Sequence, residues 1–399
     1  MGIKGLGAFL RSCVDAQKTW ESISLERLRG HRVAIDMLNI FHRHLVSAYG
    51  ILNTTVHDEA VRLALKLFLH ILESFVGHGI VPVVVCDGQA TKLKTQTQIT
   101  RRKQTDKYAS QQVDSEIRLH KIKEEQTKPK QEPVTEEEAL ERSEQILVTE
   151  SEIADLKRSI VKCVKGSVRV SDADKAKVRE FVYHLGIPFV QAEGDAEKEC
   201  AQLVREGHCI AAVSNDTDML VHGCTAVITE LFKPPNSPSR YAHNTAKIVM
   251  LSNVLTQLNL SMSAFIDFCI MCGTDYNPNV RGYGPVKCIA LIRKYGSLDK
   301  MPDVVDPSRL DTSGAPKTPF CKTKLCNEEE GKSYIEIRRE FLEHRQDIDV
   351  TKLELDECDL DKAAELCSDY NFDKYAEIHS VLMNTTTYKV PFSVEEHCK

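Results

Sequence analysis

Short apolar runs that end in an acidic residue recur three times along the chain. The segments are "HRVAIDMLN", "GIVPVVVCDG" and "HCIAAVSNDTD", and their acidic residues are Asp36, Asp87 and the pair Asp216 and Asp218. Nearly continuous runs of Val, Ile and Ala of this length are typical of strands buried on both faces, as in a parallel sheet. The pattern therefore predicts three buried strands, each followed at once by a carboxylate.

The segment between the first two runs, "DEAVRLALKLFLHILESFVGHG", has apolar residues at helical spacing and is long enough for a crossover helix. Strand, helix and strand in this order indicate an α/β fold with a central, mostly parallel sheet flanked by helices. In open α/β sheets, functional sites form at the carboxyl ends of the strands. We therefore expect the three acidic segments to converge on one edge of the sheet.

Other parts of the chain depart from this pattern. Residues 102 to about 166 are highly charged and fit a mobile, partly helical insertion and a solvated linker equally well. The pattern becomes helical after residue 275, and residues 302–332, rich in Pro, Ser, Thr, Lys and Gly, are typical of a surface loop. We expect five regions, with the boundaries 1–103, 104–166, 167–275, 276–385 and 386–399.

Composition limits the class of protein. The 399 residues are 42% hydrophobic and 28% charged, as in a soluble globular protein, and no signal peptide or membrane-spanning run is apparent. The formal net charge is −6, so binding of nucleic acid would need local positive patches. The 14 cysteines are irregularly spaced in apolar segments, which suits a reducing, intracellular compartment. Cys269 and Cys272 have zinc-ligand spacing but no second pair, so a buried helix is favoured there.

The acidic residues admit two interpretations. Residues i and i+2 of an extended chain point to the same side, so Asp216 and Asp218 would repel each other unless a cation or a proton lay between them. The alternative is a turn followed by a helix N-cap, a common role of Asp and Asn. Asp195 and Glu197 in "EGDAEKECAQLV" open a predicted helix, where the helix dipole alone favours acids. Asp275 lies in "CGTDYN", just before a glycine-rich turn.

Five ordered segments together resemble a known family. They are "VAIDMLNIF", "PVVVCDG", "GDAEKECA", "SNDTDML" and "CGTDYNPNVRGYGP", and the chain starts with "MGIKGL". The set is similar to that of the flap endonucleases, structure-specific nucleases related to the xeroderma pigmentosum G protein. The resemblance covers residues 1 to about 103, about 170 to 300 and, more weakly, 335 to about 385. It implies a PIN-like nuclease core, a helical arch inserted at residues 104–166 and a helix–hairpin–helix region that binds DNA.

The resemblance implies that seven carboxylates bind two Mg²⁺ ions, for which Mn²⁺ can substitute. Two divalent ions about 4 Å apart would generate the attacking hydroxide and relieve charge on the leaving oxygen, and hard ions prefer oxygen ligands. The family usually has Glu at position 195, so the shorter side chain here is expected to tune activity rather than abolish it. The implied ligands are Asp36, Asp87, Asp195, Glu197, Asp216, Asp218 and Asp275.

A basic segment, "TKLKTQTQITRRK", follows the second acidic run. Lys94 and Arg101 are seven residues apart and would share one face of a helix. The resemblance implies that both are catalytic and stabilise charge on the scissile phosphate, and that Arg102 contacts DNA at the base of the arch. The alternative is a solvated basic helix face. Because the insertion is longer than in typical flap endonucleases, threading of a free 5′ strand beneath it is an expectation that needs its own test.

The segment "NVRGYGPVKCIALIRKYGSL" resembles the helix–hairpin–helix that grips duplex DNA. The implied DNA contacts are Gly282, Gly284, Lys287 and Arg293, with a K⁺ ion at the hairpin. The glycines would let backbone N–H groups approach a phosphate closely without reading bases. The family commonly has Lys-Arg after Gly-Pro, whereas this chain has Val286 before the lysine and lacks one cation. The alternative is a simple turn between two packed helices.

Near the N-terminus, the resemblance places Gly2 close to the active site, where its small size would permit close contact with DNA. His42 stands where family members often have a tyrosine that stacks on a base. Either His42 or the neighbouring Phe41 could stack, because both rings have a π-face. An ordinary surface histidine is the alternative.

We therefore expect a Mg²⁺-dependent, structure-specific 5′ nuclease that hydrolyses phosphodiester bonds at 5′ flaps or related branched DNA, in replication, repair or recombination. An RNA-cleaving enzyme of the same fold and a non-catalytic junction-binding scaffold are the alternatives. The family implies a monomer located in the nucleus or at a viral replication site, with no membrane partner. A sliding clamp is a further implied partner, although the chain has no "QxxLxxFF"-like box.

Overall fold

The computed structural model describes residues 2–13, 19–88, 95–127, 136–232, 243–306, 318–326, 333–343, 350–353 and 359–368. The chain divides into two compact units. The first comprises Met1–Ile40, Lys66–Thr97 and Lys175–Lys399, and the second comprises Phe41–Leu65 and Gln98–Asp174. These boundaries do not coincide with the five expected regions, because the second unit combines the insertion with a segment from the N-terminal region.

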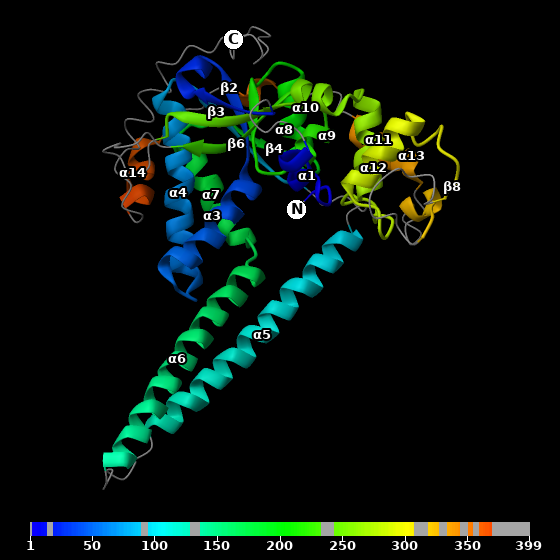
Figure 1. The fold of residues 1–399 in the computed structure, drawn as a ribbon. Coiled ribbons are helices and arrows are strands. Elements are labelled where there is room, and N and C mark those ends of the chain that lie inside the picture. Colours follow the sequence, from blue (N-terminus) through cyan, green and yellow to red (C-terminus); the bar gives the residue numbers. More distant parts are fainter. Residues whose placement is uncertain are drawn as a thin grey trace. The chain divides into compact units, whose positions relative to one another are not determined.

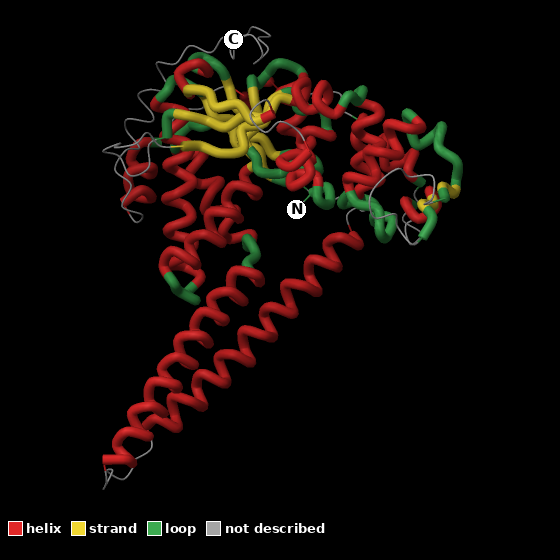
Figure 2. The backbone as a smooth tube through the Cα atoms, viewed as in Figure 1, coloured by secondary structure: helices red, strands yellow, loops and turns green. Residues whose placement is uncertain are grey.

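A mixed sheet forms the core of the first unit (Figures 1 and 2). In the described part of the chain it has seven strands, in the order β1-β7-β6-β5-β2-β3-β4. The strands from β6 to β4 are parallel neighbours, whereas β7 runs antiparallel to both β6 and β1. The prediction of a mostly parallel sheet is confirmed. The strands are β1 (Trp20–Ser24), β2 (Arg32–Asp36), β3 (Val81–Cys86), β4 (Phe189–Gln191), β5 (Ala211–Val213), β6 (Ala226–Phe232) and β7 (Thr245–Met250).

The three strands predicted from apolar runs lie side by side at the centre of the sheet. All residues of β3 and β5 are buried, which explains why their sequences do not alternate between apolar and polar residues. In the register, Asp36 lies opposite Val85 of β3, and Ile35 lies opposite Val213 of β5. The three strands therefore end within about one residue of each other, and the acidic residues that follow them emerge at one edge.

Helices of the first unit connect and cover these strands. The predicted crossover helix is α4 (His57–Gly77), which joins the second unit to the first. Helix α8 (Ala196–Arg205) packs against β2, β3 and β5 through an almost wholly buried face. The remaining helices of this part are α1 (Leu6–Cys13), η1 (Leu25–Leu28), α7 (Asp172–His184), α9 (Asp218–Val221) and α10 (Leu251–Leu258).

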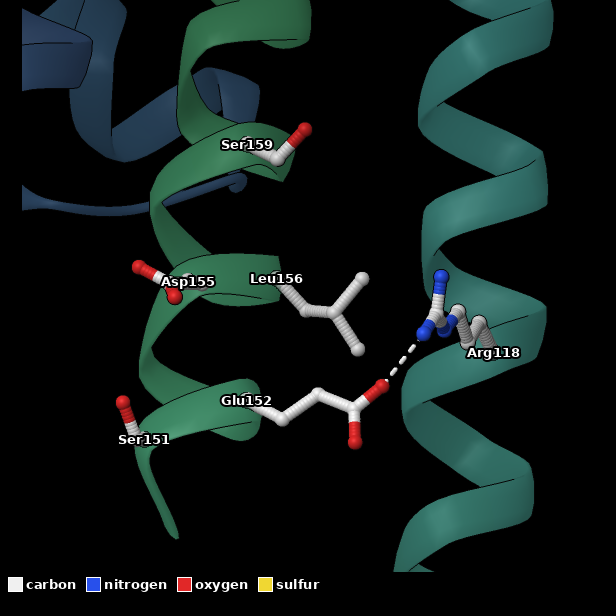
Figure 3. Close-up of a pocket in the computed structure, with 6 residues that line it drawn as sticks. All are labelled: Arg118, Ser151, Glu152, Asp155, Leu156 and Ser159. Carbon is white, nitrogen blue, oxygen red and sulfur yellow. Dashed lines mark hydrogen bonds and ion pairs between the residues drawn. The ribbon is translucent and has the colours of Figure 1, made fainter. Parts of the chain in front are cut away.

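A long helical hairpin makes up most of the second unit. Helices α5 (Thr95–Thr127) and α6 (Glu136–Ser167) run antiparallel, and α3 (Met37–Leu52) contributes its later turns. The guanidinium of Arg169 lies 2.7 Å from the Asp106 carboxylate near one end of the hairpin. Farther along it, Arg118 of α5 pairs with Glu152 of α6, and Leu156 points toward α5 beside this ion pair (Figure 3). The described part of the insertion is therefore helical, and a structureless linker is excluded for it.

The C-terminal part of the first unit is helical, as predicted. Helices α11 (Met262–Cys272) and α12 (Pro285–Tyr295) pack against each other, and α11 also contacts α13 (Tyr334–Leu342). The buried Asp267 carboxylate accepts hydrogen bonds from the Leu298 N–H and from the Arg338 guanidinium, which joins α11 to α13. Two further short helices are η5 (Val350–Leu353) and α14 (Leu360–Ser368).

The prediction of a surface loop over residues 302–332 is wrong for its described segments. Strands β8 (Val304–Val305) and β9 (Phe320–Cys321) pair, and η4 (Lys322–Leu325) follows them. The reason is apolar contact, since Phe320 is fully buried against the ring of Tyr283. Residues 307–317 and 327–332 lie outside the described residues.

No single helix that the structure describes is long and apolar enough to cross a bilayer, although α10 and α11, which meet at an 81° bend, would suffice together by length and composition.

Candidate metal centre

Four of the predicted carboxylates stand at the ends of the three central strands. Asp36 is the last residue of β2, and Asp87 follows β3 directly. Asp216 lies three residues beyond the end of β5, and Asp218 begins α9. Asp36, Asp216 and Asp218 are buried, whereas Asp87 is half-buried. The structure therefore brings these acidic residues to one edge of the sheet. This is the edge at which functional sites form in open α/β sheets, outside the carboxyl ends of the strands.

The start of α8 brings two more carboxylates to this edge. Asp195 is the residue that precedes α8, and Glu197 lies in its first turn. The Ala196 N–H donates a hydrogen bond of 2.6 Å to Asp87 Oδ1, so the carboxylate after β3 caps the helix. Asp195 makes no capping hydrogen bond with its own side chain. Asp195 thus occupies the N-cap position of α8 without capping it through its side chain, and the helix dipole favours both acids, as the alternative interpretation of these residues states.

Backbone N–H groups hold one oxygen of each remaining strand-end carboxylate. Asp36 Oδ1 accepts from the Asn39 N–H at 3.2 Å, which caps α3, and Asp216 Oδ1 accepts from the Asp218 N–H at 3.2 Å. Asp218 Oδ1 accepts from the Ile3 N–H at 2.7 Å. Asp36 thus caps α3, and Asp216 makes the turn contact that the alternative interpretation expects, whereas the Asp218 side chain anchors the N-terminal segment. A carboxylate has two oxygens, so a cap does not prevent it from binding a cation.

Three of the predicted ligands come close enough to share one ion. Oxygen atoms of Glu197, Asp216 and Asp218 all lie within 4.8 Å of one another, and these residues form the one such group found among the described residues. Opposite ligands of a six-coordinate cation with bonds of about 2.1 Å are roughly 4 Å apart. An all-oxygen set at this spacing fits a hard divalent ion such as Mg²⁺ or Mn²⁺ better than a soft one.

Electrostatic crowding is strongest at Asp36. Burial, reinforced by the carboxylates of Asp87 and Asp216, raises the pKa of Asp36 to about 7, against the downward effect of its hydrogen bonds with Asn39 and Ser214. A buried carboxylate beside two others is costly to ionise unless a cation compensates the charge. The pKa of Asp36 therefore indicates that Asp87 and Asp216 lie close to it and that the set is suited to positive charge.

The raised pKa predicts how the stability of the metal-free protein depends on pH. Unfolded Asp36 would ionise near pH 4, whereas folded Asp36 stays protonated until about pH 7. The folded state therefore binds more protons in this window, and the free energy of unfolding should fall by about 1 kcal/mol per pH unit from pH 4 to 7 through this group. Denaturant titrations in EDTA should show this fall in the wild type and a smaller one in Asp36→Asn. Equal slopes in the two proteins would contradict the assignment.

Asp195 and Asp275 meet through a tyrosine. The Tyr276 hydroxyl lies 3.5 Å from Asp195 Oδ2, and the preceding residue, Asp275, is buried. The loop that carries Asp275 is fixed by Thr274 and Asn277, whose side chains hydrogen-bond at 2.7 Å. The loop that carries Asp275 therefore contacts Asp195 through Tyr276, but the compact group of three oxygens includes neither acid.

The N-terminal segment contacts the carboxylates directly. Gly2 adopts a φ of +89°, and a Cβ atom there would lie 2.2 Å from Asp216 Oδ1 and 2.4 Å from Asp218 Oδ1. No side chain fits at either distance. The predicted closeness of Gly2 to the acidic site is therefore seen in the structure, while its contact with DNA remains a prediction.

The remaining N-terminal predictions have different outcomes. Lys94 lies outside the described residues, and Arg101 and Arg102 are exposed on α5 in the second unit. His42 is half-buried, and burial lowers its pKa below the usual range. The suggestion that Phe41 stacks on a base is wrong, because its side chain is fully buried in the core.

The glycine turn before α12 contains one glycine with a positive φ and lies near two basic side chains that contact carbonyl groups of the protein. Gly282 has a φ of +89°, whereas Gly284 has ordinary backbone angles and open space where a Cβ would point. Lys287 donates to the Gly282 carbonyl at 3.0 Å, and Arg293 donates to the Leu258 carbonyl at 2.9 Å, which caps the end of α10. Both cations thus have contacts within the protein, and their contacts with DNA remain predictions.

The alternative of a zinc site at Cys269 and Cys272 finds no support. Both side chains are buried in α11, and burial raises the pKa of both thiols well above the usual range. Zinc binds the thiolate, so these thiols behave as small apolar core residues.

Sequence patterns missed two polar residues that support the acidic cluster. Ser214 bridges Asp36 and the Asp216 backbone, and Asn39 receives a hydrogen bond from the Asn215 N–H. Ser214 lies inside the quoted segment "SNDTDML", so its place beside two acids was a usable signal. Asn39 carried no such signal, because its partner is 176 residues away.

Two family models match this chain. The XPG N-terminal domain matches residues 1–108, and the XPG I-region matches residues 186–275. The acidic residues described above are divided between the two matches. The N-terminal match contains Asp36 and Asp87, and the I-region match contains the other five, with Asp275 as its last residue.

Curated relatives agree with these matches. Flap endonuclease 1 of Cryptosporidium muris is 28% identical in an alignment of 322 residues that covers 77% of this chain and 59% of that protein. Flap endonuclease 1 of Pyrobaculum aerophilum is 28% identical in an alignment of 315 residues that covers 76% of this chain and 78% of that protein. The matched part of the chain thus spans 59% and 78% of the length of these two relatives.

Solved structures show the same fold. Flap endonuclease-1 from Methanococcus jannaschii superposes with a TM-score of 0.55 at 21% identity, covering 96% of this chain and 99% of that one. The catalytic core of Rad2 in complex with DNA substrate gives a TM-score of 0.55 at 17% identity, with coverage of 96% and 99%. With both XPG segments, the curated relatives and this fold in agreement, the chain belongs to the flap endonuclease/XPG family.

Proposed function

We propose that this protein is a metal-dependent, structure-specific 5′ nuclease that hydrolyses phosphodiester bonds in branched DNA. The observation that carries the proposal is the convergence of Glu197, Asp216 and Asp218 within 4.8 Å, at the sheet edge where Asp36 and Asp87 also end. Family membership and relatives named Flap endonuclease 1 support the reaction class. A purely structural cluster of this kind would destabilise the fold by charge repulsion.

The protein's own residues position the reaction. Glu197, Asp216 and Asp218 would hold one divalent ion, and Asp36, Asp87, Asp195 and Asp275 would complete the set for a second. When bound, two such ions activate water and neutralise charge on the leaving oxygen. Each strand-end carboxylate is oriented by a peptide N–H, which fixes the direction of its other oxygen. We infer Mg²⁺ as the physiological ion, Mn²⁺ as a substitute and K⁺ at the glycine turn before α12.

The proposed substrate is DNA with a 5′ flap. The names of the curated relatives support this choice. Shape and phosphate contacts, rather than base contacts, would provide the specificity. Cleavage of a panel of 5′ flap, bubble, nicked and single-stranded DNA with Mg²⁺ tests the proposal, and preferential cutting of the flap is expected. Equal cutting of all substrates would contradict structure specificity.

Two competitors have distinct signatures. An RNA-cleaving enzyme would cut a matched RNA flap faster than the DNA flap, because discrimination requires contacts to the 2′-hydroxyl. A junction-binding scaffold would bind branched DNA but never cut it with Mg²⁺ or Mn²⁺. Threading of the 5′ strand is tested with a bulky block at the 5′ end, which should suppress cleavage of the flap.

Charge is distributed unevenly along the part of the sequence that contains α5 and α6. Residues 124–155 carry eleven acidic and three basic residues, whereas residues 98–123 and 156–170 carry twelve basic and three acidic ones. DNA phosphates favour basic surfaces and release counterions there. We infer that the basic part of the hairpin, which includes Arg101 and Arg102, contacts DNA and that the acidic part does not.

This polarity predicts opposite effects of two sets of substitutions on binding. The variant R101Q/R102Q/K103Q should bind branched DNA more weakly. The slope of the logarithm of its binding constant against the logarithm of the salt concentration should become shallower by about 0.9 for each lost phosphate contact. The matched variant E124Q/E144Q/E150Q, which also removes three charges, should bind as tightly as the wild type or more tightly. Fluorescence anisotropy in EDTA, between 50 and 200 mM salt, measures the affinity of both variants. Over this range of salt, loss of affinity by about a thousandfold or more is expected for a protein with several phosphate contacts. Weaker binding by the glutamate variant would contradict the inference.

The remaining expectations are parts of the same proposal. We infer a monomer in a reducing, intracellular compartment, either the nucleus or a viral replication site. The eleven cysteines whose side chains the structure describes form no disulfide with one another, in keeping with such a compartment. Binding to a sliding clamp has only family resemblance in its favour.

A further inference from the structure

Two neighbouring loops carry much of the proposed metal centre. Asp36 closes β2, and Asp216 and Asp218 follow β5, the parallel neighbour of β2. The last paired residues of these two strands are Ile35 and Val213. Beyond this pair, the sheet ladder no longer fixes the spacing of the two loops, so side-chain contacts must set it.

Ser214 makes the first of these contacts. Its side chain is fully buried, and its hydroxyl donates to Asp36 Oδ2 at 3.3 Å. The oxygen of the Ser214 hydroxyl also accepts a hydrogen bond from the Asp216 N–H at 3.1 Å. One hydroxyl group therefore orients the carboxylate of one loop and holds the backbone of the other.

Asn39 makes an independent contact from the first turn of α3. Its side-chain oxygen accepts from the Asn215 N–H at 3.2 Å, and its own N–H donates to Asp36 Oδ1 at 3.2 Å. Both oxygens of Asp36 are thus held, one by Asn39 and one by Ser214. Because residues 214, 215 and 216 are consecutive, these contacts form a closed ring between the two loops.

We propose that Ser214 and Asn39 are positioning residues that hold the Asp36 loop and the Asp216 loop at the separation a divalent cation requires. This inference rests on the proposed function and adds two residues that do not ligate the ion. The physical reason is charge repulsion, since two carboxylates held close together repel each other and would drift apart without a restraint. A ring of hydrogen bonds keeps them together before the ion arrives, which increases affinity for the metal.

Calorimetric titration of the metal-free protein with Mn²⁺ tests this role without relying on activity. Ser214→Ala and Asn39→Ala should each weaken Mn²⁺ binding by about tenfold or more, as loss of supporting hydrogen bonds does in other metal sites. Asn39→Asp keeps an oxygen acceptor for the Asn215 N–H and should bind Mn²⁺ at least as tightly as the wild type.

Ser74→Ala is the matched control for a purely structural effect. Ser74 is also buried, and its hydroxyl donates to the His70 carbonyl at 2.6 Å, away from the acidic site. This variant should lose stability in denaturant titrations but keep the wild-type affinity for Mn²⁺. A loss of affinity as large as that of Ser214→Ala would show that general destabilisation explains both.

The outcomes separate the inference from the proposed function. Wild-type affinity in Ser214→Ala and Asn39→Ala would overturn the positioning role while leaving the metal centre intact. Failure of Asn39→Asp to recover the affinity lost in Asn39→Ala would overturn the role of the Asn39 oxygen. Absence of Mn²⁺ binding by the wild type would instead overturn the proposed function itself.

Discussion

Replacing Asp218 with Ala or Asn is expected to abolish cleavage of a 5′ flap while leaving its binding intact. Asp218 belongs to the group of three oxygens that could share an ion, and loss of one ligand removes charge stabilisation of the transition state. A cost of roughly 4 kcal/mol corresponds to a rate reduction of about a thousandfold. Single-turnover cleavage and anisotropy on the same flap, both with Mg²⁺, measure the two effects separately.

The two substitutions at Asp218 differ in a useful way. Asn retains an oxygen that can accept from the Ile3 N–H, whereas Ala loses the 2.7 Å hydrogen bond that anchors the N-terminal segment. Asp218→Asn should therefore fold as stably as the wild type and still fail to cut. Asp267→Asn is the control, because Asp267 is an equally buried aspartate that pairs with Arg338 outside the cluster. Asp267→Asn should lose stability but keep cleavage. Near-normal cutting by Asp218→Asn would refute the role of Asp218 as a metal ligand.

Replacing Gly2 with Ala is expected to reduce cleavage by about a hundredfold, the effect of displacing catalytic groups by about 1 Å. The new Cβ would lie 2.2 and 2.4 Å from oxygens of Asp216 and Asp218, so either the N-terminal segment or the carboxylates must move. Movement of either would disturb the hydrogen bond from Ile3 to Asp218. The cleavage rate and the Mn²⁺ affinity should fall together.

Gly5→Ala is the matched control for backbone strain. Gly5 also has a positive φ, +75°, but a Cβ there would meet the Pro285 side chain at 3.3 Å rather than a carboxylate. Strain of about 1 kcal/mol is expected in both variants, because an L-residue disfavours this backbone region. If Gly5→Ala lost as much Mn²⁺ affinity as Gly2→Ala, contact with the carboxylates would not be the cause.

The central sheet and most of the acidic site could be predicted because each depends on local signals. Apolar runs of Val, Ile and Ala mark strands buried on both faces, and the acidic residue after each run marks its carboxyl end. The rule that sites form at strand ends then brings Asp36, Asp87 and Asp216 together without knowledge of the strand order. The grouping of Glu197 with Asp216 and Asp218 followed from the family motifs.

The remaining features depend on contacts between distant parts of the chain. Strands β1 and β7 pair antiparallel at one side of the sheet, yet the sequence of β1, WESIS, has no continuous apolar run and that of β7, TAKIVM, has one of only three residues. The Ile3 N–H reaches Asp218 across 215 residues, and Asn39 reaches Asn215 across 176. The sequence alone leaves both Phe41 and His42 as candidates to stack on a base, because two neighbouring rings do not reveal which one faces the core. The structure buries Phe41. No local pattern encodes such pairings.

The most direct test of the account is a crystal structure of the protein soaked in Mn²⁺, with anomalous diffraction measured at the manganese edge. If the proposed metal centre is correct, an anomalous peak will lie between the carboxylates of Glu197, Asp216 and Asp218, at distances of about 2.1 to 2.2 Å from their oxygens, which are typical of small divalent ions. This peak is expected to disappear in Asp218→Asn. Carboxylates that point away from one another, with no peak at millimolar Mn²⁺, would contradict it.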